Sequence, residues 1–215
     1  MTEPRSQPAN AAERNGIGIL GGSFNPPHAT HLRLCRSALE QLPIREVRVI
    51  PAGDHPHKRG PGMAPAAHRL AMCRLSFAGD PRLVVDDREL RRAGPSFTID
   101  TLAELAAEHP GRRLFFLIGS DNLPLLPTWR DARGILARCT VVTWPRQNHP
   151  VDDRTIDALP FPAAERATLR ANVLAMPADA IAATDLRARL ARGDTDLPEL
   201  DEAVRAYIAA HRLYR

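Results

Sequence analysis

The sequence predicts an α/β fold, a doubly wound parallel sheet flanked by helices. Short apolar runs of strand type alternate along the chain with longer segments of helical periodicity. Strands separated by helices pair in parallel through right-handed crossovers, which produces an open sheet with helices on its faces. The chain has 215 residues, 44% of them hydrophobic and 25% charged, which is enough for one domain with a sizeable core.

Each predicted strand is a short apolar run, and each predicted helix is a longer segment with a helical pattern. The strands, in chain order, are Ile17–Leu20, Val47–Ile50, Leu83–Val85, Leu114–Ile118, Thr140–Thr143 and Val173–Ala175. The helices between and after them are His31–Gln41, Pro65–Phe77, Thr98–Glu108, Asp131–Ala137, Ala163–Arg170, Thr184–Ala191 and Pro198–Ala210. Ligands of such sheets bind beyond the carboxyl ends of the strands, so the loops directly after each strand are the candidate functional segments.

The ends of the chain and its cysteines narrow the class of protein. Residues 1–15 are polar and lack the apolar stretch of a secretory signal, so we expect a disordered tail followed by a single domain over 16–215. No run approaches the roughly 18 apolar residues of a membrane span. The three cysteines are scattered, without a Cys-x-x-Cys pair, which favours reduced thiols in the cytoplasm; they are Cys35, Cys73 and Cys139.

The charge of the chain suits a small anionic ligand. The formal net charge is +4, and acidic residues are interspersed among the basic ones. This balance fits a nucleotide and indicates nucleic acid only weakly, so we do not expect a nucleic-acid partner. Lys58 is the only lysine among 29 basic residues. Either the chain simply favours arginine, or position 58 needs a compact ammonium group that arginine cannot replace.

The run Gly16-Ile17-Gly18-Ile19-Leu20-Gly21 has the spacing of a dinucleotide-binding fingerprint. Such a fingerprint follows a strand and opens a helix. Here a polar tail precedes the run and the predicted strand lies inside it. A dehydrogenase is therefore disfavoured.

The segment from Gly21 to His31, Gly-Gly-Ser-Phe-Asn-Pro-Pro-His-Ala-Thr-His, is more informative. It starts where the first predicted strand ends, and its paired glycines let the backbone approach a ligand closely. His28 and His31 are three residues apart, on one face of the next helix's first turn. Free N–H groups, the helix dipole and two imidazoles then converge, which predicts a polyphosphate site. Alternatively the histidines only cap and pack the corner; zinc is less favoured because no third ligand is evident.

The same segment resembles the nucleotidyltransferase signature G-G-x-F-[DN]-P-x-H-x-G-H, with Thr30 in place of the usual glycine. Further segments resemble the nicotinate-nucleotide adenylyltransferase family, and the similarity extends from about residue 17 to 214. These segments are Pro51-Ala52-Gly53 with Pro56-His57-Lys58, Gly94–Leu102, Leu117–Asp121 with Trp129, and Ile181–Arg187, where Ala182 and Ala183 replace serines. The resemblance implies a Rossmann-like fold of nucleotidyltransferase type. It also implies transfer of AMP from ATP to nicotinate mononucleotide, giving nicotinate adenine dinucleotide and pyrophosphate in NAD biosynthesis.

The resemblance also implies the site residues. Adenylyl transfer needs no enzyme nucleophile, so the enzyme's task is to position the substrates and stabilise negative charge. The expected catalytic residues are His28, His31, Lys58 and Arg187. The residues expected to bind ATP are Gly21, Gly22, Ser23, Phe24, His28, His31, Gly119, Asp121, Thr184 and Arg187. The residues expected to bind the mononucleotide are Asn25, Lys58, Thr98 and Trp129. Mg²⁺ is the expected cofactor, carried with ATP, and no metal site made by the protein is expected.

Each of these residues also has a structural interpretation. Lys58 suits an exposed loop, Trp129 a partly buried core position, Asp121 a helix cap, and Arg187 a solvated helix surface. Composition alone does not decide between these roles and the functional ones.

Two other functions remain open from the sequence. The same reaction on nicotinamide mononucleotide would differ only in an amide for a carboxylate. A nucleotide- or nucleic-acid-binding homologue with impaired catalysis is kept open by Thr30, Ala182 and Ala183. The sequence makes no prediction of oligomeric state.

Overall fold

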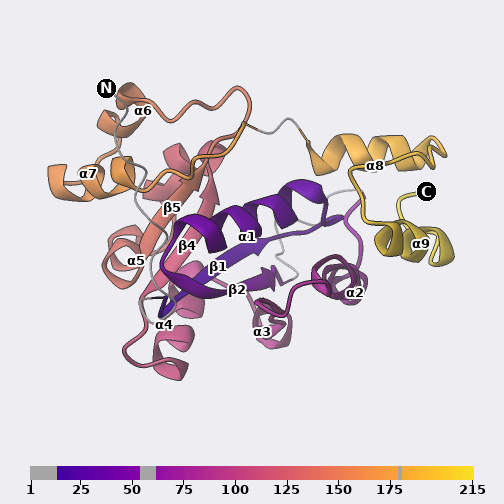
Figure 1. Ribbon diagram of the computed structural model, residues 1–215, viewed down its shortest axis with the longest axis horizontal. Coiled ribbons are helices and arrows are strands. Elements are labelled where there is room, and N and C mark those ends of the chain that lie inside the picture. The colour runs from indigo at the N-terminus through magenta and orange to yellow at the C-terminus, as the bar shows by residue number, and fades with distance from the viewer. Residues whose placement is uncertain (1–13, 54–61, 179–180) are drawn as a thin grey trace.

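The computed structural model describes residues 14–53, 62–178 and 181–215, and its centre is a five-stranded parallel sheet (Figure 1). In spatial order the strands are β3 (Leu83–Val85), β2 (Ile44–Pro51), β1 (Gly16–Gly22), β4 (Leu114–Gly119) and β5 (Thr140–Trp144). The chain builds outward from β1 to β3, then returns to the other side of β1 for β4 and β5. This reversal confirms the predicted doubly wound sheet and creates a switch point between β1 and β4.

The described helices fall between and after these strands. They are α1 (Ala29–Gln41), α2 (Ala66–Phe77), α3 (Arg88–Arg91), α4 (Thr98–Glu108), the 3₁₀ helix η2 (Ser120–Thr128), α5 (Ala132–Arg138), α6 (Asp153–Asp157), α7 (Ala163–Ala171), α8 (Ala183–Ala191) and α9 (Glu202–Ala210). They cover both faces of the sheet.

Alternation along the strands divides the core between the two faces. Ile17 and Ile19 of β1 pack in one apolar cluster with α4 and α5, whereas Leu20 packs in a second cluster with α1 and α2. Side chains of successive strand residues point to opposite faces, so β1 supplies both clusters. Every residue of β4 is buried, as expected for a central strand covered on both sides.

A third apolar cluster attaches the C-terminal helices to α2. It contains Met72 of α2, Leu186 of α8, and Val204 and Ile208 of α9. In Figure 1, α8 and α9 lie together at the end of the molecule next to α2. α2 also contributes Cys73 to the second cluster, the one that contains Leu20. The third cluster, with α8 and α9, is therefore continuous with the rest of the core.

The prediction of a sixth strand at Val173–Ala175 is wrong. Val173 makes one isolated bridge to Thr143 of β5, and two backbone hydrogen bonds from Thr143 and Leu174 complete the contact. Two bonds are too few for a strand. The apolar character that suggested one has another cause, because Leu174 is buried in the cluster with α1 and α2.

Three short helices were missed and one helix starts later than predicted. α3, η2 and α6 are too short, or too rich in proline, to show a helical period; η2 contains Pro124 and Pro127. The last helix begins at Glu202 and not at Pro198, because Asp201 caps it by accepting a hydrogen bond from Ala203 N. The predicted tail falls largely on residues 1–13, outside the described residues.

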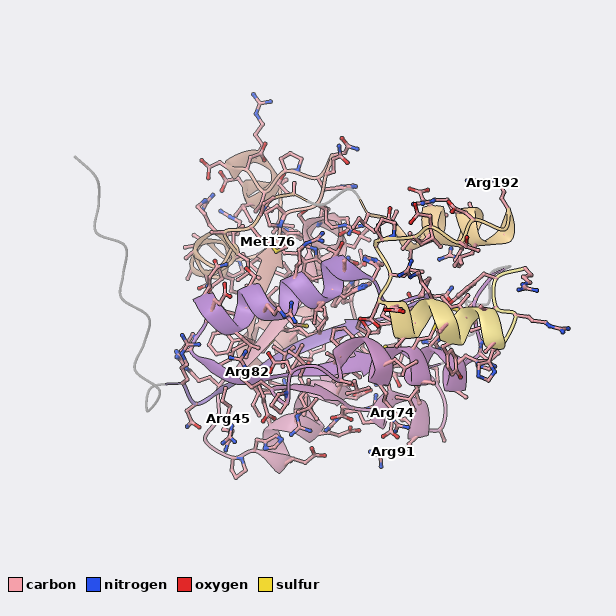
Figure 2. The ribbon with its side chains drawn as sticks, turned by 45° about the vertical axis from the view of Figure 1, so that its right-hand side comes forward. Arg45, Arg74, Arg82, Arg91, Met176 and Arg192 are labelled. Carbon is pink, nitrogen blue, oxygen red and sulfur yellow. The ribbon has the colours of Figure 1, made fainter. Side chains whose placement is uncertain are left out.

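The arginines of the surface are scattered. Figure 2 shows Arg45, Arg74, Arg82, Arg91 and Arg192 pointing outward from different parts of the molecule. Several are neutralised locally, as in the pairs of Arg82 with Asp80 and Arg91 with Asp87, both at 2.7 Å. In the part of the chain that the structure describes, no helix is long and apolar enough to cross a membrane.

Candidate active site

A cavity of about 640 Å³ opens at the carboxyl ends of β1, β2 and β4. Its wall is built by Gly21, Gly22 and Ser23 at the end of β1, by Ala52 and Gly53 after β2, by Thr98 at the start of α4, and by Gly119 and Trp129 around η2. These are the loops that the switch-point rule selected from the sequence. Six of the predicted site residues therefore share one cavity: Gly21, Gly22, Ser23, Thr98, Gly119 and Trp129.

The two histidines lie at the N-terminus of α1, five and eight residues after Ser23, and neither of them lines the cavity. His28 is the N-cap residue, and its ring centroid is 3.9 Å from that of His31. The His28 backbone N–H donates a hydrogen bond to His31 Nδ1 at 3.1 Å. Because Nδ1 accepts, the proton of neutral His31 sits on Nε2, which leaves Nε2–H as the donor for a ligand.

The charge state of His31 follows from its surroundings. Burial holds the pKa of His31 well below its ordinary value, and the nearby His28 and Arg146 lower it further. His31 is therefore neutral at pH 7 and acts as a hydrogen-bond donor without a formal charge. The capping interpretation and the ligand interpretation are compatible, because the cap uses Nδ1 only.

Phe24 and Asn25 have structural roles that the sequence did not indicate. Phe24 has φ of 45° and its side chain is buried in the cluster under the sheet, where its ring lies 4.9 Å from that of His31. The contact with ATP predicted for Phe24 stays a prediction. The buried Asn25 side chain does not line the cavity wall.

The Asn25 amide joins three segments. Its Nδ2 donates to Gly62 O at 3.0 Å, and its Oδ1 accepts from Ala64 N at 3.0 Å and from the Tyr214 hydroxyl at 2.7 Å. It thus connects the turn after β1 to the segment before α2 and to the end of the chain. A contact of Asn25 with the mononucleotide stays a prediction.

α8 brings Arg187 to the same turn. Arg187 Nη1 donates to Asn25 O at 2.9 Å, and its Nη2 lies 3.3 Å from the hydroxyl oxygen of Thr184. The N-cap of α8 is Ala182, so no side chain caps this helix start. The structure places Thr184 and Arg187 next to the β1–α1 turn, although about 160 residues separate them along the chain.

Arg146, which no sequence motif singled out, does not line the cavity but contacts residues around the predicted site. Its backbone N–H donates to Ser120 Oγ at 2.8 Å, its Nη1 donates to Ile181 O at 3.5 Å, and its Nε is 3.9 Å from Asp121 Oδ1. It follows β5 by two residues. The strand-end rule pointed to this position, but no motif distinguished it among many arginines.

Position 119 has no room for a side chain, because other side chains pack against its backbone. A Cβ at this position would be 2.3 Å from Asp121 Oδ1 and 3.3 Å from both Arg146 Cγ and Trp144 Cζ2. The three side chains therefore converge above the end of β4. Asp121, predicted to bind ATP, lies at this point in the first turn of η2.

Trp129 has the partly buried core position considered for it, and its contact with the mononucleotide stays a prediction. It packs against the core, with its ring edge-to-face with Phe116 at 5.9 Å, and it also lines the cavity. Lys58 lies outside the described residues, so its catalytic and mononucleotide contacts stay predictions. Among the residues that are described, no three His, Cys, Asp or Glu side chains form a group that could hold a metal ion.

Comparison with known proteins adds to this geometry. A profile of the cytidylyltransferase-like family matches residues 19–189. A probable nicotinate-nucleotide adenylyltransferase of Albidiferax ferrireducens is 40% identical over 93% of this chain and 98% of its own length. One of Laribacter hongkongensis is 41% identical over 94% of this chain and 96% of its own.

A solved structure shares the fold. The nicotinic acid mononucleotide adenylyltransferase of Plasmodium falciparum, complexed with NaAD, superposes with a TM-score of 0.72. The match covers 93% of this chain and 97% of that one, at 17% sequence identity.

Proposed function

This chain belongs to the nicotinate-nucleotide adenylyltransferase family, and from that premise we propose that it transfers AMP from ATP to nicotinate mononucleotide. The products are nicotinate adenine dinucleotide and pyrophosphate, and the reaction belongs to NAD biosynthesis. The observation that carries the proposal is the pairing of His28 and His31 at a helix N-terminus that follows β1, at whose end Gly21, Gly22 and Ser23 line a cavity of about 640 Å³ at the sheet's switch point.

The reaction is an in-line displacement. A phosphate oxygen of the mononucleotide attacks the α-phosphorus of ATP, a new P–O bond forms, and the bond to pyrophosphate breaks. Negative charge shifts towards the leaving pyrophosphate. The protein lowers the barrier by holding donors where that charge develops.

The described donors divide by charge. His31 supplies a neutral Nε2–H, and Arg187 and Arg146 supply guanidinium groups for the triphosphate. The N–H groups of Ala183 and Thr184 at the start of α8 add to them, whereas at the start of α1 the Ala29 N–H donates to Glu199 O and the His31 N–H to His28 O. With Ala182 and Ala183 in place of serines, α8 relies on its backbone and on Thr184. Lys58 is a further proposed phosphate contact.

The mononucleotide base occupies the other part of the cavity. Thr98 and Trp129 lie on its wall. A Trp indole can stack on a pyridine ring, and the hydroxyl and backbone donors at the start of α4 are suited to the substituent of the ring.

The nucleotidyltransferase family works with a divalent metal ion, and we propose Mg²⁺ bound to ATP. Asp121 supports this, since its carboxylate lies over the end of β4 and 3.9 Å from Arg146 Nε, where the triphosphate is proposed to bind. When bound, the ion neutralises phosphate charge in the transition state.

We also propose that residues 16–215 act as one domain and that the protein works in the cytoplasm. Continuity of the core through α2 supports the first statement. The second is supported by three buried, unbridged thiols, Cys35, Cys73 and Cys139.

The test is a mononucleotide panel. Purified protein with ATP and Mg²⁺ is given nicotinate mononucleotide, nicotinamide mononucleotide or no acceptor, and pyrophosphate and dinucleotide are measured. We expect both products with the acid and slower turnover with the amide. ATP binding without pyrophosphate release from either substrate would identify a binding protein that lacks catalysis and would overturn the proposal.

A further inference from the structure

One arginine of the cavity wall has no carboxylate partner in the part of the chain that the structure describes. Arg130 directly follows Trp129, and its Cζ lies 4.6 Å from the centroid of the Phe97 ring. No carboxylate within the described ranges pairs with it, and its guanidinium lies over the face of the Phe97 ring.

Neighbouring arginines behave differently. Arg133, three residues later, lies 3.5 Å from Glu165, and Arg92 lies 2.7 Å from Glu104. A guanidinium that rests on an aromatic face without an acidic partner keeps its planar fork available for an anion.

The charges of the wall make this position distinctive. Among the described residues that line the cavity, Arg130 is the only cation and Glu89 the only anion. Glu89 Oε1 accepts a hydrogen bond from the Thr101 hydroxyl at 2.8 Å, which engages part of that carboxylate within the protein. A negative group entering beside Trp129 therefore has one wall residue of opposite charge to pair with.

The two candidate mononucleotides differ only in the charge of the group on the pyridine ring. Their phosphates and riboses are the same, but the pyridine ring carries a carboxylate in one and a neutral amide in the other. A carboxylate can accept two hydrogen bonds from one guanidinium, whereas an amide oxygen offers a weaker, uncharged acceptor.

We propose that Arg130 is a specificity-determining residue, whose guanidinium pairs with the pyridine carboxylate and makes the enzyme prefer the acid to the amide. The proposal rests on the proposed function and deepens it. Phe97 contributes by stacking on the guanidinium, which limits the side-chain freedom that would otherwise be lost on binding.

The test is the ratio of kcat/KM for the two mononucleotides in Arg130→Gln. We expect kcat/KM for nicotinate mononucleotide to fall about tenfold, the size of one charge-assisted hydrogen bond at an exposed group. The kcat/KM for nicotinamide mononucleotide and the KM for ATP should both change by less than about twofold, since under this proposal neither substrate pairs with the Arg130 guanidinium. Arg130→Lys keeps the charge without the fork and should retain part of the preference.

The matched control is Arg113→Gln. Arg113 also rests on a phenylalanine, with Cζ 5.4 Å from the Phe115 centroid, but it does not line this cavity. Its substitution should leave the ratio unchanged, and thermal melts of both variants show whether they fold.

The outcomes are separable. A ratio that stays constant in a folded Arg130→Gln, whether both rates fall together or neither falls, overturns the role of Arg130 while the adenylyltransferase activity stands. Wild-type protein that turns over neither mononucleotide overturns the function and this inference with it.

Discussion

Asn25→Ala should destabilise the protein strongly, because the Asn25 side chain is buried and makes three hydrogen bonds within the protein. A net contribution of roughly 0.5–1.5 kcal/mol for each of the three bonds gives a loss of about 1.5–4.5 kcal/mol in the free energy of unfolding. For a domain of this size that corresponds to a fall in Tm of roughly 3–18 °C. Urea unfolding and calorimetry without substrates measure both quantities.

Gln41→Ala is the matched control. The Gln41 amide also bonds Ser37 and Ala175, with distances from 2.6 to 3.2 Å, but it is exposed. Water replaces its lost partners, so we expect a cost under about 1 kcal/mol. The reasoning is refuted if Asn25→Ala melts like the wild type and instead raises only the KM for the mononucleotide, because Asn25 would then be a substrate ligand.

Three further predictions concern the site. His31→Ala should lower kcat by about 10²–10³ with the fold intact, since it removes one donor to the transition state; steady-state kinetics with a thermal melt measure this. Because the pKa of His31 is lower in the folded protein than in the unfolded chain, His31 of the unfolded chain takes up a proton at a higher pH. The free energy of unfolding of the wild type should therefore fall as the pH drops below about 6.5. Urea titrations at several pH values should show a smaller dependence on pH for His31→Ala. Tyr214→Phe should lower Tm more than Tyr207→Phe, because the Tyr214 hydroxyl bonds the buried Asn25 side chain whereas that of Tyr207 bonds His68; equal melting temperatures for the two variants would contradict the role of the Tyr214 contact.

The strand-end rule located much of the candidate site from the sequence. Gly21 and Gly119 are local features, a glycine at the tip of an apolar run, and the structure places both at the cavity. Arg146 lies at an equivalent tip and was overlooked, because an arginine in an arginine-rich chain carries no local signal. The contacts that distinguish Arg146 are made to Ser120, at the start of η2, and to Ile181, in the segment before α8, and both lie far from Arg146 in the sequence.

The errors in the fold have a similar origin. Val173–Ala175 is apolar because Leu174 is buried, and burial alone does not distinguish a strand from an irregular segment. α3 and α6 have four and five residues, fewer than two helical turns, so no periodicity could reveal them.

The sequence by itself determined the alternation of strands and helices, the glycine turn after β1, and the two histidines at the start of α1. Each of these depends on residues close together in the chain. Only the tertiary structure decided what the polar side chains do: Asn25 bonds to Tyr214, 189 residues away, and Arg130 has no acidic partner among the described residues although Arg133 has one. The physical reason is that a polar group's role depends on whether its partner is protein or ligand, and those partners come from segments that only folding brings together.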